Sequence, residues 1–250
     1  MPTINIVTAV VAGKHDHIGE TYASLCAQTM PEGWYWRWIV QEDGETGIPQ
    51  AELPEDDPRI VRGMGRFGRA PMARTVALAQ ADGVLTRAVD ADDVLPPHAL
   101  AQDIRVLSEN PDIGWVASPT MRMDTGQLIP GRWSPGPGRI EPGALWRGEQ
   151  VGRLPVHGTA VCAYTTLIEA LGGWVAVPGS EDVQLLLALE AVAPGYMAEE
   201  VGLYYRKWGA ATTSEQSWWD LAQHRAWELL LSRRVQALHR TGWSWHLAAA

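Results

Sequence analysis

The chain has 250 residues, of which 46% are hydrophobic and 20% are charged, enough to bury the core of one large α/β domain. Its formal net charge of -9 weighs against nucleic acid or an anionic membrane as a partner, because both require a positively charged surface. Cys26 and Cys162 are the only cysteines, which excludes a disulfide framework and a thiolate zinc site. The N-terminus lacks the basic region of a signal peptide, and no apolar run reaches the roughly 18 residues that span a bilayer. We therefore predict a cytoplasmic protein without a membrane span.

Strand-like and helix-like patterns alternate through the first part of the chain. Apolar runs predict strands over 4–11, 36–40, 59–62 and 84–89, and helical spacing predicts helices over 17–30, 71–81 and 99–109. This alternation predicts a parallel sheet flanked by helices. The carboxyl ends of parallel strands meet at one edge, where ligands bind, so the turns that follow Val40 and Val89 should lie together.

The rest of the chain continues this pattern, with one long interruption. We expect strands near 113–118, 156–163 and 201–208 and helices over 165–171 and 180–191. Residues 130–148 combine many glycines and prolines with no periodicity, which predicts a long loop. From 216 to about 239 the apolar positions predict an amphipathic helix or helix pair that packs on the sheet or on a second subunit.

Three carboxylates, those of Asp90, Asp92 and Asp93, follow the predicted strand over 84–89. On an extended segment residues i and i+2 point the same way, so Asp90 and Asp92 can reach one cation. Mg²⁺ and Mn²⁺ typically take one or two carboxylates together with the phosphates of a substrate. The alternatives are a solvated acidic turn, or capping of the following helix by Asp93. Spacing alone leaves the two interpretations even.

Two further acidic pairs have both a functional and a structural interpretation. Asp43, in the Glu-Asp-Gly stretch, can accept a hydrogen bond from a base N–H, or it can belong to an ordinary Asp-Gly turn. Glu181 and Asp182 open a predicted helix, where acidic residues suit the helix dipole and Ser180 can cap the first turn. In the functional interpretation one of these two carboxylates is a general base for an acceptor hydroxyl.

Basic residues near these carboxylates are weak signals individually. Arg74, on the predicted helix over 71–81, can offset the charge of a diphosphate, as can three arginines around the glycine-rich stretch 63–68. His157 is either an acceptor-site residue or a hydrogen-bonded core histidine.

Taken in order, these segments resemble a family 2 glycosyltransferase of the GT-A fold, an inverting enzyme that uses a nucleotide-sugar. The family's opening strand is similar to INIVTAVV, and its strand ending in Asp-Gly-Ser is similar to WIVQEDGETG. Its block from an Ala-Arg-Asn helix to the Asp-X-Asp motif is similar to GRAPMARTVALAQADGVLTRAVDADDVLPPHAL. Its Gly-Gly and Glu-Asp motifs are similar to ALGGW and GSEDVQLLLAL. The resemblance covers about residues 3–210 and implies a mostly parallel central sheet flanked by helices, with a C-terminal helical extension.

The resemblance implies a donor site at the rim of the sheet. The nucleobase pocket would be lined by Ala9, Val10, Val11 and Asp43. Arg74 would lie near the diphosphate. Asp90 and Ala91 would contact the nucleotide, and Asp90 would also belong to the metal site. Asp92 would bind the divalent cation, Mn²⁺ or Mg²⁺, that bridges the two phosphates.

The resemblance also implies an acceptor site and a base. Gly172, Gly173 and Trp174 would shape the acceptor side, with His157 as a further candidate. Asp182, with Glu181 beside it, would take the acceptor proton while that oxygen attacks C1 of the sugar. The cation would stabilise the departing nucleoside diphosphate.

Two positions depart from the family pattern. Family members often carry Arg-X-His near the last strand, and Trp208 stands where that histidine would be. Arg206, Lys207 and Trp208 are therefore the candidates for phosphate contacts. Thr75 replaces the asparagine that usually follows the arginine at 74. The Gln-X-X-Arg-Trp motif and membrane helices of processive members do not occur in the sequence, which predicts transfer of a single sugar to a soluble small-molecule acceptor.

We expect a GT-A catalytic domain over 1–214, with a nucleotide-binding half over 1–95 and an acceptor-binding half over 96–214. A helical extension over 215–250 is a candidate contact for a homodimer. UDP-hexose is the favoured donor. One alternative is a sugar nucleotidylyltransferase, but its glycine-rich basic loop after the first strand is matched poorly by residues 12–17. The other is a non-catalytic GT-A-like protein that binds a nucleotide-sugar, which only Trp208 supports.

Overall fold

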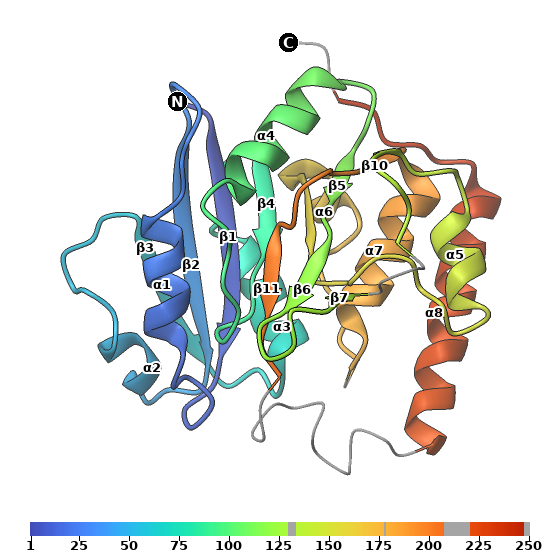
Figure 1. Ribbon diagram of the computed structural model, residues 1–250. Coiled ribbons are helices and arrows are strands. Elements are labelled where there is room, and N and C mark those ends of the chain that lie inside the picture. The colour runs from blue at the N-terminus through green and yellow to red at the C-terminus, as the bar shows by residue number, and fades with distance from the viewer. Residues whose placement is uncertain (130–133, 178, 208–220, 248–250) are drawn as a thin grey trace.

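The computed structural model describes residues 1–129, 134–177, 179–207 and 221–247. They form a central eight-stranded sheet with helices on both faces and a smaller three-stranded sheet beside it (Figure 1). The large sheet has the order β3-β2-β1-β4-β9-β5-β10-β8. Its strands are β1 (Thr3–Val10), β2 (Tyr35–Asp43), β3 (Ile60–Gly65), β4 (Leu85–Ala88), β5 (Trp115–Ala117), β8 (Gly138–Arg139), β9 (Val161–Tyr164) and β10 (Gly195–Met197). The small sheet has the order β11-β6-β7, with β6 (Thr120–Arg122), β7 (Leu128–Ile129) and β11 (Leu203–Tyr205).

The central sheet is mostly parallel, as predicted. Neighbours among β3, β2, β1 and β4 run parallel, and so do β5 and β10. β9 runs antiparallel to both β4 and β5, and β8 runs antiparallel to β10. Because β1, β2 and β4 are parallel neighbours, the residues that follow Val10, Asp43 and Ala88 come out at the same edge of the sheet.

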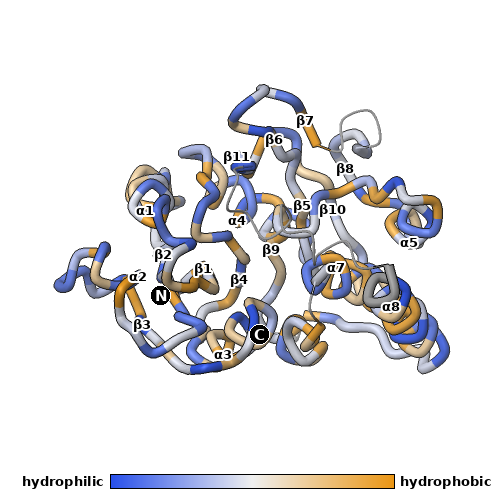
Figure 2. The backbone as a smooth tube through the Cα atoms, turned by 90° about the horizontal axis from the view of Figure 1, so that it is seen from below, coloured by the Kyte–Doolittle hydropathy of each residue, from blue (hydrophilic) through white to orange (hydrophobic). Residues whose placement is uncertain are grey.

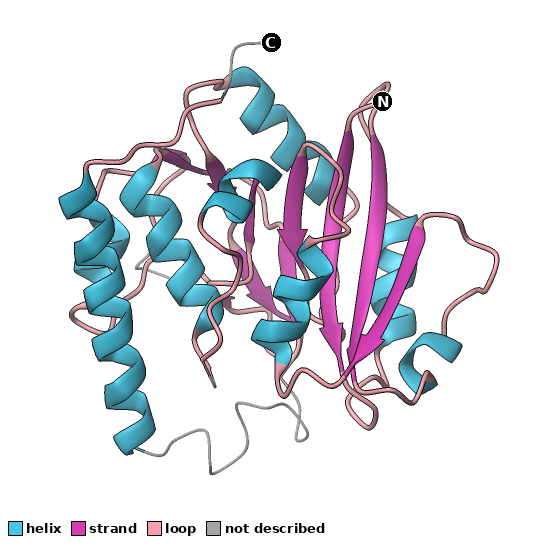
Figure 3. Ribbon diagram, turned by 180° about the vertical axis from the view of Figure 1, so that it is seen from behind, coloured by secondary structure: helices cyan, strands magenta, loops and turns pink. Residues whose placement is uncertain are grey.

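Helices cover both faces of this sheet (Figures 2 and 3). α1 (Ile18–Cys26) and α4 (Ala99–Glu109) lie on one face, and α3 (Ala70–Leu78) and α7 (Glu181–Val192) on the other (Figure 2). The short helices are α2 (Ile48–Ala51), α5 (Ala144–Glu149) and α6 (Thr165–Ala170). Within the described ranges, no helix has both the length and the apolar character that a bilayer crossing needs.

The C-terminal helix α8 (Leu221–Thr241) packs against α7. Trp227, Leu231 and Val235 are buried and recur every four residues, so they lie on one side of the helix. Hydrophobic and hydrophilic residues alternate around α8 in Figure 2, as an amphipathic helix requires. The predicted amphipathic helix is therefore a single helix over its described part.

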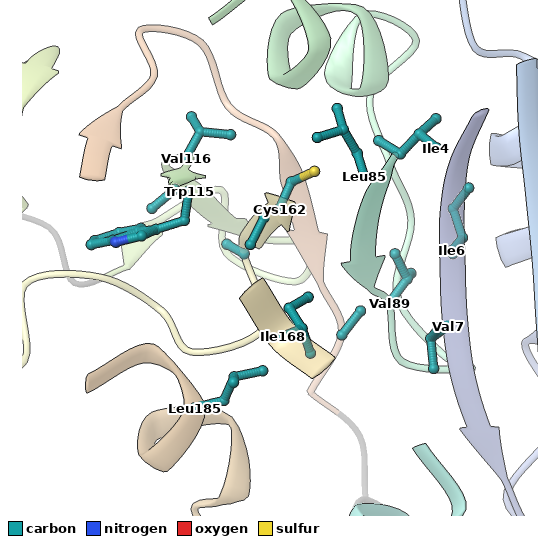
Figure 4. Packing of buried hydrophobic residues seen from close by; sticks show 14 of the residues in the cluster. Ile4, Ile6, Val7, Leu85, Val89, Trp115, Val116, Cys162, Ile168 and Leu185 are labelled. Carbon is teal, nitrogen blue, oxygen red and sulfur yellow. The ribbon is translucent and has the colours of Figure 1, made fainter. Parts of the chain in front are cut away.

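The core continues across the whole sheet. Cys162 of β9 lies between Leu85 of β4 and Val116 of β5, with Ile168 and Leu185 facing the same region (Figure 4). Burial of both faces of β1 explains why apolar residues occur on both faces of this strand.

One buried polar group of this core, the Thr8 hydroxyl, makes bonds that also position the rim. The Thr8 hydroxyl donates to the Val89 carbonyl at 2.7 Å and accepts from the Trp38 indole N–H at 2.8 Å. These bonds connect β1, β2 and the residue that precedes Asp90.

The predicted long loop over 130–148 is partly structured. It contains β8 and α5, and residues 130–133 lie outside the described ranges. α5 follows Gly143, whose φ of 78° is in the left-handed region, and its Leu145 and Trp146 N–H groups donate to Glu190 of α7 at 2.8 and 2.9 Å. The first turn of α5 therefore has its N–H groups satisfied by a carboxylate 45 residues later in the chain, which local periodicity does not reveal.

Candidate active site

Asp90, Asp92 and Asp93 lie together in the turn that follows β4. One oxygen of each carboxylate can be chosen so that all three lie within 4.8 Å of one another. The Asp93 N–H donates to the Asp90 carbonyl at 3.2 Å, which closes the turn. The Thr21 hydroxyl of α1 lies 3.1 Å from the Ala91 carbonyl and 2.8 Å from the Asp93 carbonyl. The carboxylates therefore project from a turn whose backbone is held on both sides.

The chemistry of this acidic turn fits a divalent cation. Asp93 is fully buried; its Oδ1 accepts the Arg206 N–H at 2.9 Å, and its Oδ2 has no hydrogen-bond partner among the described residues. Burial, and then the charges of Asp90 and Asp92, raise the pKa of Asp93 well above its ordinary value. A buried carboxylate oxygen without a partner is costly unless a proton or cation offsets its charge. Mg²⁺ and Mn²⁺ prefer such oxygen ligands.

Arg74 of α3 connects the acidic turn to the Glu-Asp pair of α7. Its Nη2 donates to Asp90 and its Nη1 donates to Glu181, and the arginine side chain is only 6% exposed. Burial alone would lower the pKa of Arg74, but Asp90 and Glu181 raise it, so the guanidinium stays charged. The sequence resemblance predicts Arg74 near a diphosphate, and the structure shows which two carboxylates hold it.

Glu181 and Asp182 form the first turn of α7. Ser180, just before them, has φ 60° and is the one described non-glycine residue in the left-handed region. It makes no side-chain capping bond, contrary to the structural interpretation of this motif. Burial raises the pKa of both carboxyls, and Arg74 opposes this in part. A strained backbone at such a position is typical of functional sites.

The Asp182 carboxylate lies against Gly158 and an apolar cavity. A Cβ atom on Gly158 would fall 2.3 Å from Asp182 Oδ2. The cavity walls include Ile168, Trp174 and Leu185. An apolar wall disfavours the charged form of a carboxyl group and makes it a better proton acceptor once ionised.

His157 packs beside this region. Its Nδ1 is 3.0 Å from the Thr159 hydroxyl, and its ring centroid is 5.0 Å from that of Tyr205. Burial lowers the pKa of His157, although the charge of Asp90 raises it in part. The residue is therefore a hydrogen-bonded, partly buried histidine within electrostatic reach of the acidic turn.

Gly172, Gly173 and Trp174 form the turn that ends α6. The two glycines have φ of 79° and 71°, a conformation that glycine adopts without strain. The Trp174 side chain is buried, and its backbone is hydrogen-bonded to Thr75 of α3. The turn thus lies between α3 and the cavity beneath Asp182.

The end of β2 is built around two carboxylates. Asp43 Oδ1 accepts the Phe67 and Gly68 N–H groups at 2.8 and 2.9 Å, so it holds the glycine-rich segment that follows β3. The buried carboxylate of Glu42, to which the sequence assigns no role, accepts the Thr46 and Gly47 N–H groups at 3.0 and 2.8 Å.

The other predicted donor residues lie nearby. Ala9 and Val10 end β1, and Val11 follows it with 38% of its surface exposed. Arg206 donates through Nε to the Asp92 carbonyl at 2.8 Å and through Nη2 to Glu20 at 2.6 Å, so its charge is directed at the acidic turn and α1. Lys207 is exposed, and Trp208 lies outside the described residues.

The structure therefore brings the acidic turn, Arg74 and the Glu-Asp pair into one connected site. Gly158 and Thr75 belong to it, and the sequence assigns neither a role there. Gly158 has no distinguishing sequence signal. Thr75 has one, because it follows Arg74 directly on the same helix and departs from the family pattern.

Comparison with known proteins finds similar structures at low sequence identity. No protein-family model matches the sequence. No curated protein sequence matches it. A solved structure of S. aureus TarS 1–349 superposes with a TM-score of 0.65 at 15% identity, covering 82% of this chain and 60% of that chain. The same fragment with UDP-GlcNAc gives a TM-score of 0.69 at 16% identity, covering 86% and 61%.

The complex of TarS 1–349 with UDP gives a TM-score of 0.60 at 13% identity, covering 84% of this chain and 61% of that chain. This chain thus spans about three fifths of the length of those TarS chains. Its fold, a large and mostly parallel sheet flanked by helices, is that of the TarS glycosyltransferase.

Proposed function

We propose that this protein is an inverting glycosyltransferase that moves one sugar from a nucleoside-diphosphate sugar, with UDP-hexose favoured, to a hydroxyl of a small-molecule acceptor. The observation that carries the proposal is the Arg74 bridge, in which one buried guanidinium contacts both Asp90 of the acidic turn and Glu181 of α7. It sets a candidate cation site beside a candidate base. The shared fold supports it, since TarS has been solved with UDP and with UDP-GlcNAc.

On the donor side, Asp92 and Asp90 would hold Mn²⁺ or Mg²⁺, which when bound offsets the charge of the diphosphate leaving group. The nucleobase would lie between the end of β1, at Ala9 to Val11, and Asp43, with Ala91 close to the ribose. Lys207 and Trp208 are proposed phosphate contacts. Arg206 would act there through the acidic turn that it holds.

On the acceptor side, Asp182 would accept the proton of the acceptor hydroxyl as its oxygen attacks the anomeric carbon. The bond from that carbon to the phosphate oxygen breaks, and the diphosphate leaves with the electron pair. Glu181, held by Arg74, fixes the start of α7. His157 and the turn at Gly172 to Trp174 would shape the acceptor pocket.

The test compares Asp182→Asn with the wild-type chain and with Asp56→Asn, which removes an exposed carboxylate remote from the site. UDP affinity in Mn²⁺ is measured by calorimetry, and turnover as hydrolysis of UDP-glucose and UDP-GlcNAc. D182N should lose at least about 100-fold in turnover, because a general base contributes that much, and keep its UDP affinity. Wild-type turnover in D182N would refute the base assignment.

The same assay separates the alternative functions. UDP binding without turnover by the wild-type chain would identify a binding protein. A nucleotidylyltransferase would be identified by reaction of the sugar nucleotide with pyrophosphate, which forms a nucleoside triphosphate and releases a sugar 1-phosphate. The catalytic domain over 1–214, the extension over 215–250, a homodimer through α8 and the cytoplasmic location stay predictions.

A further inference from the structure

We propose that Thr75 is a positioning residue that fixes the turn at Gly172 to Trp174, the wall of the proposed acceptor pocket, to helix α3. This inference rests on the proposed function. The Thr75 hydroxyl meets both backbone groups of Trp174. Oγ1 donates to the Trp174 carbonyl at 2.7 Å and accepts the Trp174 N–H at 3.0 Å. A helical threonine commonly bonds a carbonyl of its own helix, whereas this one joins α3 to a turn 99 residues later in the chain.

Trp174 is the residue of this turn whose backbone is directed at α3. The Gly172 N–H donates to the Glu169 carbonyl and the Gly173 N–H to the Ile168 carbonyl, both at 2.9 Å, so these two amides belong to the end of α6. The close approach of Thr75 leaves little room for a side chain at 173. A Cβ atom there would lie 3.0 Å from Thr75 Oγ1 and 3.1 Å from its Cγ2.

The hydroxyl matters because of where the Trp174 side chain lies. Trp174 is 3% exposed and forms part of the cavity wall beneath Asp182. Arg74, one residue earlier on α3, contacts Asp90 and Glu181. Two consecutive side chains of one helix therefore set the positions of the cation site, the start of α7 and the wall beneath the base.

Removing the hydroxyl should release the wall and leave the donor site intact. A buried N–H and carbonyl that lose their partner cost free energy, so the turn moves to recover those bonds. The bonds that hold the acidic turn come from Thr21 and Arg206 and do not involve Thr75. We therefore expect catalysis to fall without a matching loss of nucleotide affinity.

The first measurement is independent of activity. Amide hydrogen exchange is followed by NMR in wild type, Thr75→Val, Thr75→Ser and Thr241→Val, whose exposed hydroxyl bonds to the Leu238 carbonyl and the Trp243 N–H at the end of α8. In T75V the Trp174 amide should exchange at least about tenfold faster, while the Gly172 and Gly173 amides stay within about twofold. T75S and T241V should match wild type. Unchanged exchange at Trp174 in T75V would overturn the proposed contact.

The second measurement tests the role in catalysis, with UDP affinity in Mn²⁺ and UDP-GlcNAc hydrolysis as readouts. T75V should keep UDP affinity within about twofold and lose at least about tenfold in kcat, since misplaced groups lose that much, and T75S should restore kcat. Wild-type kcat in T75V, a parallel loss of UDP affinity, or failure of T75S to rescue would overturn the proposal. If wild type neither binds UDP nor hydrolyses the sugar nucleotide, the proposed function fails, and the exchange data still decide the contact.

Discussion

Gly158 lies directly against the carboxylate of Asp182. A Cβ atom at residue 158 would fall 2.3 Å from Oδ2 and 2.7 Å from Cγ of that side chain. Gly158→Ala must therefore displace the carboxylate. Because a shift of about 1 Å in a catalytic group can cost about 100-fold, we expect UDP-GlcNAc hydrolysis to fall by about 10- to 100-fold while UDP affinity is kept.

The matched control for this change is Gly19→Ala. A Cβ atom at residue 19 of α1 meets nothing within 4 Å, and alanine is the better helix former. G19A should have wild-type kcat and a melting temperature at least equal to that of wild type. A G158A variant with wild-type kcat would show that the position of Asp182 does not limit turnover.

Arg74→Met should destabilise the fold as well as the site. It leaves Asp90 and Glu181 without their counter-charge, and the Glu181 side chain is only 11% exposed. Breaking one partner of a buried ion pair costs about 3–5 kcal/mol, and we expect the lower end because Asp90 is 30% exposed. Urea denaturation measures the loss. Arg139→Met, which breaks an exposed pair with Asp112, should leave the free energy of unfolding unchanged.

The pH dependence of turnover should report the burial of Asp182. Burial raises its pKa above the ordinary value of 3.8, and only the ionised carboxylate accepts a proton. The rate of UDP-GlcNAc hydrolysis should therefore fall as the pH drops through this raised pKa. Arg74 lowers the Asp182 pKa in part, so R74M should move the acid limb of the pH–rate profile to higher pH. An acid limb at or below the ordinary value would contradict the assignment of Asp182 as the base.

Removal of the divalent cation should weaken nucleotide binding through the acidic turn. We expect EDTA to reduce UDP affinity by at least about tenfold in wild type, because the diphosphate loses its counter-charge. Asp92→Ala should show the reduced affinity already in Mn²⁺ and no further response to EDTA. Calorimetry with Asp56→Asn as control checks this, and a D92A variant that still responds to EDTA like wild type would exclude Asp92 as a ligand.

Elements with a strong local pattern were predictable from the sequence. The predicted helix over 99–109 coincides with α4, and the run over 4–11 lies within one residue of β1. The short strands β6, β7, β8 and β10 have two or three residues each, too few to show a period of two. Glu190 accepts two N–H groups in the first turn of α5, those of Leu145 and Trp146, and no window around residue 145 contains that information.

The candidate site was likewise predictable from the sequence only in part. The acidic turn could be placed at the rim because it follows a buried strand of a parallel sheet. The pairing of Arg74 with Asp90 and Glu181 could not, because the sequence contains several arginines and does not say which carboxylate each one meets. The close contact of Gly158 with Asp182 likewise exists only once β9 and α7 are packed together.

Under the proposed function, the placement of α3 limits how an acceptor preference can be changed. Arg74 and Thr75 lie before residue 95, and the groups they contact on α7 and at Trp174 lie after it. A chimera that joined the first part of this chain to the second part of a related one would have to preserve both contacts across the junction. New acceptors are therefore better sought by substitutions around Trp174 and His157 than by exchange of whole halves.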